Sequence, residues 1–166
     1  QALRNYELDR TRARSHPLLP VGMNTINIGV IHGGAGLGTN GLPITMTNPA
    51  IIPDTAVIDL DMKFLPSETS AEYRKDFEAF VHHFAQTDAW LCAHPPTIEW
   101  ELGGLYFPPL NTSVDHPLVQ SLVRQKSKIG KAPDIKGFVA VCDAAHYAGA
   151  GMDGVIYGPA GDGFHG

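Results

Sequence analysis

The chain contains eight histidines, the side chains best suited to bind a metal ion or to transfer a proton near neutral pH. Two of them lie beside glycines: His32 follows an alternating stretch, and His165 lies in the glycine-rich segment 158–166. Glycine lets the backbone and a neighbouring imidazole approach a ligand closely. His32 could therefore contact a ligand or simply end a strand, and His165 could bind a ligand or simply fill a loop.

The other histidines have structural interpretations. His82 and His83 are adjacent in an expected helix, so their side chains point about 100° apart and cannot bind one ion as a pair four residues apart would. Asp143 and His146 could face each other on a helix, but we favour a helix cap at Asp143 with a buried polar His146. The remaining histidines precede a proline or lie in the first turn of a helix: His16, His94 and His116.

Two other chemical motifs are weak. The pattern Gly36-x-Gly38-x-x-Gly41 matches the dinucleotide fingerprint, which requires a helix that starts at the last glycine. Leu42 and Pro43 forbid that helix, so we expect a loop and no nucleotide site. The chain has no Gly-x-Ser-x-Gly elbow, and neither cysteine has a basic neighbour in sequence, so no covalent nucleophile is indicated.

The elements that would position these residues begin with the stretch 51–66, IIPDTAVIDLDMKFLP. Its apolar residues alternate with charged ones, which predicts a strand in the middle of an antiparallel sheet that is covered on one side. The same period predicts strands over 26–31 and 97–102, with the first strand ending at His32. A long irregular loop is expected over 33–54.

A helix is expected between the second and third strands. Its apolar residues recur at helical spacing from Tyr73 to Phe84, and Thr69-Ser-Ala-Glu72 has the form of a capping box. We expect this helix to cover the apolar face of the sheet. A first helix is predicted near the N-terminus, with the arginines at 10, 12 and 14 decorating its solvated end.

The second half of the chain has a different pattern. It predicts a helix capped by Asp115, with Pro117 in its first turn, then a strand over 137–141, a helix over 143–149 and a buried strand over 154–157. Such an order is typical of the edge of an α/β sheet, where ligands bind at the carboxyl ends of strands. The glycine-rich loop 158–163 would lie at that place.

Composition excludes several classes of protein. The net charge of −5 and the scattered basic residues argue against nucleic acid or an anionic membrane as a partner. No run of about 18 apolar residues is present, as a membrane-spanning helix would need. Two isolated cysteines, Cys92 and Cys142, suit a reducing compartment, and we expect a cytoplasmic protein. The chain opens inside a helical pattern and stops in a loop, so we expect part of a longer polypeptide.

Three passages resemble the family of acetylornithine deacetylase, succinyl-diaminopimelate desuccinylase and carboxypeptidase G, which are zinc metallohydrolases. They are INIGVIHGG at 26–34, IIPDTAVIDLDMKFLP at 51–66, and CDAAHY followed by GVIYGPAGDGFHG at 142–166. They occur in the family's order and span nearly the whole chain. The resemblance implies an α+β fold: residues 1–104 would form an antiparallel, ferredoxin-like lid (βαββαβ lacking its first strand), which is also the dimerisation domain. Residues 105–166 would form the C-terminal α/β part of the catalytic domain.

The resemblance also implies a function for the complete protein. It would be a homodimer that hydrolyses amide bonds in N-acyl amino acids or small peptides, using two zinc ions. His165 would be a metal ligand, and His32, Asn48, Lys63, Gly158 and Gly161 would contact substrate. Lys63 stands where the family commonly has arginine, and Asn48 could replace an asparagine that is Ala50 here. The general base and the other ligands precede the lid in the family, so this chain would be inactive alone.

A second hypothesis comes from a different class of protein. The chain could be a dimerisation module without chemistry of its own, which associates through an exposed sheet edge or helix. The two hypotheses differ in the length of the parent polypeptide.

Overall fold

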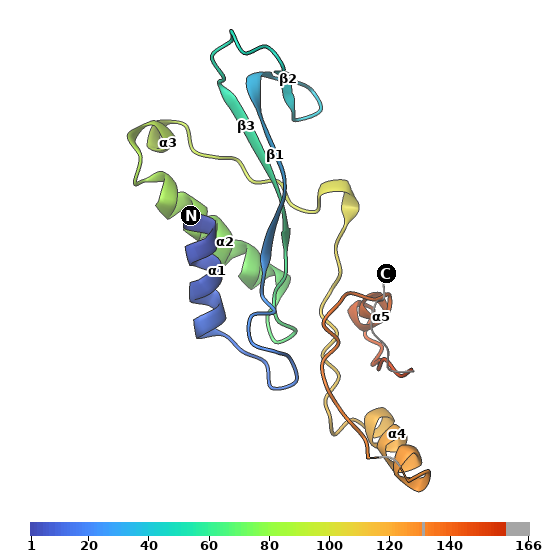
Figure 1. Ribbon diagram of the computed structural model, residues 1–166. Helices are drawn as coiled ribbons and strands as arrows, with labels where there is room; N and C mark the ends of the chain where they lie inside the picture. The colour runs from blue at the N-terminus through green and yellow to red at the C-terminus, as the bar shows by residue number, and fades with distance from the viewer. Residues whose placement is uncertain (131, 159–166) are drawn as a thin grey trace. The chain divides into compact units, whose positions relative to one another are not determined.

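The computed structural model describes residues 1–130 and 132–158. The chain divides into two compact units, one formed by residues 1–13 and 24–64 and the other by residues 14–23 with the described residues from 65 onward. Each unit mixes helices with extended segments, and the first contains a small antiparallel sheet (Figure 1). The predicted α+β class is therefore confirmed.

The first unit joins helix α1 (Ala2–Ala13) to strands β1 (Ile26–Leu37), β2 (Pro43–Thr45) and β3 (Thr55–Met62). The strand order is β2-β1-β3, with antiparallel pairing throughout (Figure 1). The alternating stretch thus forms the predicted strand β3. Its predicted place in the middle of the sheet is wrong for the described residues, because β1 takes that place and β3 lies at an edge.

A bulge in β1 changes which residues share a face of the sheet. Ile28 pairs with Leu60, but the register shifts before Val30, which pairs with Asp59, and Ile31 then pairs with Ile58. Residues directly opposite each other in an antiparallel pair lie on the same face. Ile31 therefore joins the apolar face, and Val30 shares the face of the aspartate. A strict period of two predicts that Val30 lies on the same face as Ile28. The extra residue at the bulge breaks that period, and sequence alternation does not indicate where a bulge occurs.

Strand β1 also continues five residues beyond its predicted end at His32, and β2 returns along it as a hairpin. The glycines that suggested a loop permit this close pairing. A Cβ at Gly34 would overlap the carbonyl oxygen of Thr45 and lie 2.9 Å from Cβ of Pro43. Gly36 has φ of +70°, a conformation that side chains rarely adopt. The predicted loop over 33–54 thus contains strand at 33–37 and 43–45, and no helix follows Gly41, as expected.

The end of α1 is not simply solvated. Arg10 is 5% exposed, and its guanidinium lies 5.7 Å from the centre of the Tyr6 ring. The Thr11 hydroxyl donates a hydrogen bond to the Oδ1 of buried Asn24, which ties α1 to the start of β1. The expectation of a solvated basic cluster is therefore wrong for Arg10, whose stem and charge are both covered.

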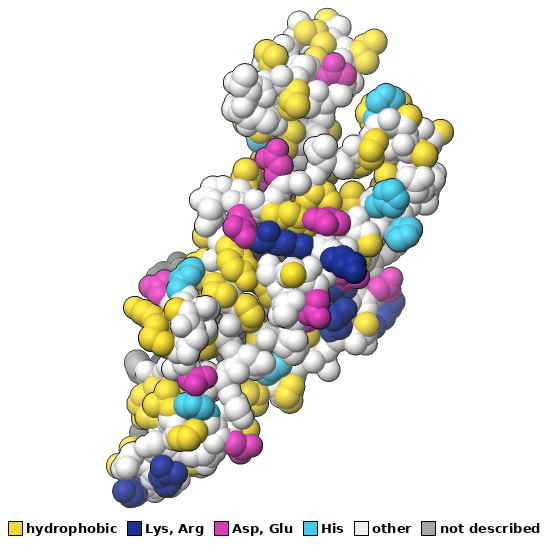
Figure 2. Space-filling view, turned by 180° about the vertical axis from the view of Figure 1, so that it is seen from behind, with side chains coloured by type: hydrophobic (Ala, Val, Ile, Leu, Met, Phe, Trp, Pro, Cys, Tyr) yellow, Lys and Arg dark blue, Asp and Glu magenta, His cyan; other side chains and the backbone are white. Residues whose placement is uncertain are grey.

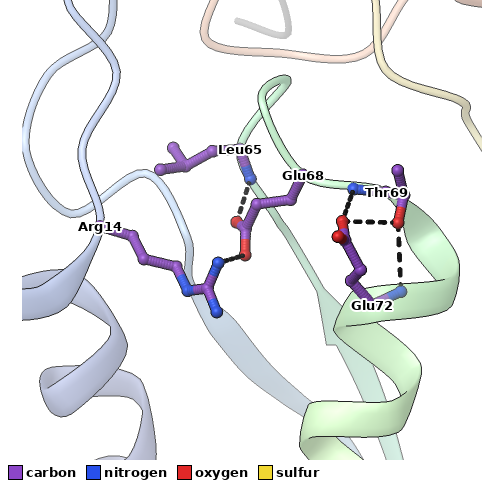
Figure 3. A network of polar contacts seen from close by, with 5 residues as sticks. All are labelled: Arg14, Leu65, Glu68, Thr69 and Glu72. Carbon is purple, nitrogen blue, oxygen red and sulfur yellow. Dashed lines mark hydrogen bonds and ion pairs between the residues drawn. The ribbon is translucent and has the colours of Figure 1, made fainter.

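The second unit begins with helix α2 (Ser70–Ala85), which starts as the capping box predicts. The Thr69 hydroxyl accepts a bond from the Glu72 N–H at 3.2 Å, and the Glu72 carboxylate accepts from the Thr69 N–H at 3.1 Å (Figure 3). Just before it, buried Glu68 accepts from the Leu65 N–H at 2.9 Å and pairs with Arg14 at 3.2 Å (Figure 3). Backbone donors left by the helix start and the preceding turn are thereby satisfied.

Helix α2 and the sheet belong to different units, so the expectation that the helix covers the apolar face stays a prediction. A further short helix, α3 (Ala89–Ala93), lies in the predicted connector after α2. The carboxylate of Asp88 accepts bonds from the N–H groups of Trp90 and Leu91 and caps it.

The predicted strand over 97–102 is absent from the described residues. Trp100 instead packs edge-on against Phe77 of α2, with ring centres 5.9 Å apart, and its indole N–H donates to Glu78 at 2.7 Å. A short 3₁₀ turn, η1 (Leu102–Gly104), follows. Alternation in this stretch reflects one side packed on a helix, which gives the same pattern as a strand with one covered face.

Two further helices lie among the remaining described residues, α4 (Pro117–Lys128) and α5 (Ala144–Gly149). Pro117 occupies the first turn as predicted, but His116 and not Asp115 is the N-cap, because its Nδ1 accepts from the Leu118 N–H. The strands predicted over 137–141 and 154–157 do not form among the described residues. Gly137 instead donates its N–H to the Leu18 carbonyl at 2.7 Å.

Candidate functional site

His32 lies on β1, half-buried and paired with Val57 of β3. The pairs on the same face of the sheet include Asn27 with Asp61 and Val30 with Asp59. The imidazole thus belongs to the more polar side of the sheet, opposite the face that carries Ile31. This placement suits a residue that contacts a polar ligand, and it follows from the strand pairing alone.

Asn48 lies in the exposed loop between β2 and β3. Its side-chain Oδ1 accepts a hydrogen bond from the Ala50 N–H at 3.0 Å, and its carbonyl accepts from the Ile51 N–H. This is an Asx turn, in which the side chain imitates a backbone turn. The amide oxygen therefore already orders the loop, and the amide NH₂ group is the part that can point toward a ligand.

Lys63 follows the end of β3, where its backbone N–H donates to the Thr25 carbonyl at 2.8 Å and its side chain is exposed. Six residues of extended chain separate it from Val57, the partner of His32, which corresponds to about 20 Å along the sheet. The structure therefore keeps His32 and Lys63 apart within one chain. A small substrate could contact one of them but not both.

Asp54 is a polar contact that sequence reasoning missed. Its carboxylate accepts from the Gly36 N–H at 2.8 Å and from the Thr55 hydroxyl at 2.9 Å. The Gly36 N–H bond and then the Thr55 hydroxyl hold the pKa of this carboxyl below its usual value. Asp54 thus joins the start of β3 to the outer part of β1. No local motif signals a contact across 18 residues.

The predicted substrate-binding glycines and the predicted metal ligand lie at the end of the chain. Gly158 is exposed, and a Cβ added there would meet no atom within 4 Å. Gly161 and His165 lie outside the described residues. Their assignments stay predictions.

The described residues do not form a metal site by themselves. Among residues 1–130 and 132–158, no three side chains of the types His, Cys, Asp or Glu come together in a way that could hold an ion. His146 is exposed, not buried as predicted, and its ring lies 5.1 Å from the centre of Phe107. His116 pairs through Nε2 with Asp153 at 3.1 Å. These histidines have structural contacts.

Two open hollows occur in the second unit. One, of about 290 Å³, is lined by residues of α2 and of the following connector: Glu78, Val81, His82, Pro95, Pro96 and Ile98. The other, of about 280 Å³, lies between residues 109–112 and 148–153. His32, Asn48, Lys63 and Gly158, the predicted site residues that the structure describes, line neither hollow.

Hydrophobic side chains are spread over the visible face among polar and charged ones (Figure 2). On the apolar face of the sheet, Ile31 is 66% exposed and its partner Ile58 is 49% exposed. Exposed apolar side chains that lie together mark a surface that associates with another surface. No helix in the described part of the chain has the length and apolar character needed to cross a membrane.

Comparison with known proteins gives two kinds of match. Residues 4–88 match the family model described as the peptidase dimerisation domain of the M20 family. The chain is also 30% identical over 153 residues to N-formyl-4-amino-5-aminomethyl-2-methylpyrimidine deformylase of Bacillus subtilis (strain 168), an alignment that covers 88% of this chain and 33% of that protein. The deformylase of the same name from Halalkalibacterium halodurans is 28% identical over 166 residues, which cover 96% of this chain and 36% of that protein.

The chain thus spans about a third of the length of these curated relatives. No solved structure matches it at a significant level. The dimerisation-domain match covers the sheet of the first unit and helix α2, and it extends over about half of the chain. This chain therefore belongs to the M20 family of zinc metallohydrolases, as the resemblance of its three sequence passages predicted.

Proposed function

We propose that the protein containing this chain hydrolyses an amide bond between a small acyl group and a primary amine. The observation that carries this proposal is the alignment with a deformylase over 88% of the chain, which includes residues beyond the dimerisation domain. A formamide and the amide of an N-acyl amino acid contain the same reacting bond. The substrate is then an N-acyl amino acid, a small peptide or an N-formylated aminomethyl heterocycle.

Members of the M20 family are generally metal-dependent. The described residues of this chain do not supply a metal site, so the pair of zinc ions belongs to the complete protein. There, His165 would be one ligand among several from outside this chain. Zinc bound in this way lowers the pKa of a coordinated water and polarises a carbonyl, with a base from outside the chain.

The proposed roles of His32 and Lys63 are consistent with their places in the first unit. His32 and Lys63 are about 20 Å apart, so each would contact a different part of the bound substrate or a different bound molecule. Lys63 offers a compact positive charge without the bidentate geometry of arginine, which suits a single oxygen acceptor. Gly158 and Gly161 would offer backbone groups to substrate at the other end of the chain.

The experiment compares three acyl groups on each of two amines. The complete protein is incubated with N-formyl, N-acetyl and N-succinyl forms of an aminomethylpyrimidine and of an amino acid, and release of the primary amine is measured. We expect release from at least one of these amides and loss of release after treatment with a chelator. Absence of release from every amide, by a folded protein with full zinc content, would refute the proposed reaction.

A dimerisation role is the second candidate, and the exposed isoleucines of the sheet favour it. We propose that the complete protein is a homodimer in the cytoplasm and that residues 1–104 form the contact between its subunits, with residues 105–166 in the catalytic domain. This role is compatible with catalysis. It becomes the whole function only if the complete protein is a dimer that fails to hydrolyse any of the amides above.

A further inference from the structure

The segment that follows Trp100 makes an unusual turn. Three of its four residues have left-handed backbone conformations, with φ of 58° at Glu101, 68° at Gly103 and 72° at Gly104. The Gly104 N–H donates to the Glu101 carbonyl at 2.7 Å and closes the turn. Glycine adopts this conformation without steric cost, but Glu101 has a Cβ that crowds its own carbonyl. Glu101 is the one non-glycine residue with positive φ in the described chain.

Packing does not hold the turn in place. Leu102 is 66% exposed and Leu105 is 72% exposed. A Cβ added at Gly103 or Gly104 would meet no atom within 4 Å. A strained residue persists only where its surroundings impose the conformation. The restraint must therefore come from the side chain of Glu101 and from the residues on either side of the turn.

Arg74 of helix α2 supplies that restraint. Its guanidinium forms an ion pair with the Glu101 carboxylate, and its Nε donates to the Ser70 hydroxyl at 3.1 Å. The same guanidinium lies 5.2 Å from the ring centre of Trp100 and 5.9 Å from that of Tyr106. One side chain thus contacts the residue before the turn, the strained residue in it and the residue after it. Cation–π contacts at these distances are favourable.

The two sides of the turn are anchored differently. Trp100 is fixed on α2 by its ring contact with Phe77 and by the bond from its indole N–H to Glu78. On the far side, Tyr106 is half-buried and contacts α2 through the cation–π interaction with Arg74. Loss of the Arg74 contacts would therefore free the chain after the turn while Trp100 stays in place.

We propose that Arg74 and Glu101 form a latch on a backbone pivot at Gly103 and Gly104. In the latched state, the ion pair holds Glu101 in its left-handed conformation and the cation–π contact holds Tyr106. In the released state, Glu101 relaxes to an ordinary conformation, and the chain from Leu105 turns about the two glycines. This device does not depend on the proposed hydrolase activity.

Amide hydrogen exchange of the complete protein tests the latch directly. Exchange is followed by mass spectrometry on two peptides. The peptide 99–107 contains the Gly104 N–H, whose bond to Glu101 closes the turn, and the peptide 73–84 reports on helix α2. We expect Arg74→Gln to speed exchange in 99–107 about fivefold to tenfold, the combined effect of one partly exposed ion pair and two cation–π contacts. Exchange in 73–84 stays unchanged. Lys75→Gln, at the next and exposed position of α2, is the matched control and leaves both peptides unchanged.

A second variant separates what Arg74 does through Glu101, by the ion pair and the strained backbone together, from its ring contacts. Glycine accepts the left-handed conformation, so in a protein that carries Glu101→Gly the addition of Arg74→Gln should have a much smaller effect on 99–107. Equal exchange in Arg74→Gln and the parent protein would refute the latch. So would an equal effect of Arg74→Gln with and without Glu101→Gly, or faster exchange in 73–84, which would make Arg74 a stabilising residue of α2.

Discussion

Single carboxylates join segments of this chain that are distant in sequence. Glu68 lies buried between Arg14 and the Leu65 N–H, and Asp54 accepts the Gly36 N–H across the sheet. Glu68 is buried and Asp54 is exposed, and each carboxylate accepts a hydrogen bond from a backbone N–H that would otherwise lack a partner within the protein. In both cases the partners come from segments that the sequence does not show to be neighbours.

The contact of Asp54 predicts a local dependence on pH. The pKa of Asp54 is lower in the folded than in the unfolded protein, where it is about 4. The bond to Gly36 therefore stabilises the fold fully above the unfolded pKa, and this stabilisation is lost as pH falls through the folded pKa. We expect Asp54→Ala at pH 7 to speed exchange of the Gly36 amide. In the parent protein, exchange of the Gly36 amide should likewise become faster when the pH falls below the folded pKa of Asp54.

Site-resolved hydrogen exchange across this pH range, with rates corrected for intrinsic exchange, measures the effect. Asp61→Ala, an exposed aspartate at the other end of β3, is the control and should leave the Gly36 amide unchanged. A Gly36 amide that exchanges equally in the parent and in Asp54→Ala would show that the bond adds no protection.

At the scale of elements, local motifs predicted helices better than strands. The capping box fixed the start of α2 because its bonds lie within four residues, and Pro117 marked the first turn of α4 in the same way. Strands depend on partners far along the chain. Alternation in 97–102 therefore described a segment packed on α2, and glycines in 33–37 concealed the second half of β1.

Predictions for the site also succeeded for local patterns and failed for contacts between residues far apart in sequence. The faces of β3 followed from periodicity, but His32 lies inside β1 and not at its predicted end, and the bulge changed the faces of both Ile31 and His32. The wide separation of His32 from Lys63 required the register. The bond of Asp54 and the latch of Arg74 on Glu101 link residues 18 and 27 apart, for which no sequence spacing is diagnostic.

The capping box gives a prediction at the scale of one helix. Thr69→Ala removes the hydroxyl that accepts from Glu72 and should destabilise the protein by about 1 kcal/mol. The Thr69 hydroxyl, and then the Thr69 N–H, hold the pKa of Glu72 below its usual value. The variant should therefore also raise that pKa toward normal.

Urea unfolding at pH 7 measures the first effect, and an NMR titration of the Glu72 carboxyl measures the second. Ser67→Ala, at an exposed position just before the box, serves as the control and should change neither. An unshifted Glu72 titration in Thr69→Ala would mean that the hydroxyl does not contact the carboxylate in solution.

At the scale of the whole molecule, the apolar face of the sheet and the dimerisation-domain match point to association between chains. Ile31 and Ile58 pair across β1 and β3 and are both exposed in one chain. Exposed apolar surface of this kind becomes stable in water when a second surface covers it. The sheet is therefore where subunit contact is expected first.

We expect Ile31→Asp to weaken dimerisation of the complete protein, because a charge would have to be buried at the contact. Sedimentation velocity over a range of concentrations should show a shift from dimer toward monomer. Ile129→Asp, at a position in the second unit that is 68% exposed, is the control and should leave the dimer intact. A parent protein that is monomeric at high concentration would contradict the dimer itself.

We propose above that this chain is part of a metal-dependent amide hydrolase and that His165 is one of its metal ligands. Turnover of an N-acyl amine by His165→Ala in the complete protein tests this most directly, with His82→Ala as control because His82 is exposed on α2. We predict a loss of more than about 100-fold in turnover for His165→Ala, with lower zinc content and an unchanged melting temperature. The control should keep full activity. Full zinc content and unchanged turnover in His165→Ala would contradict the proposed role of His165 as a metal ligand.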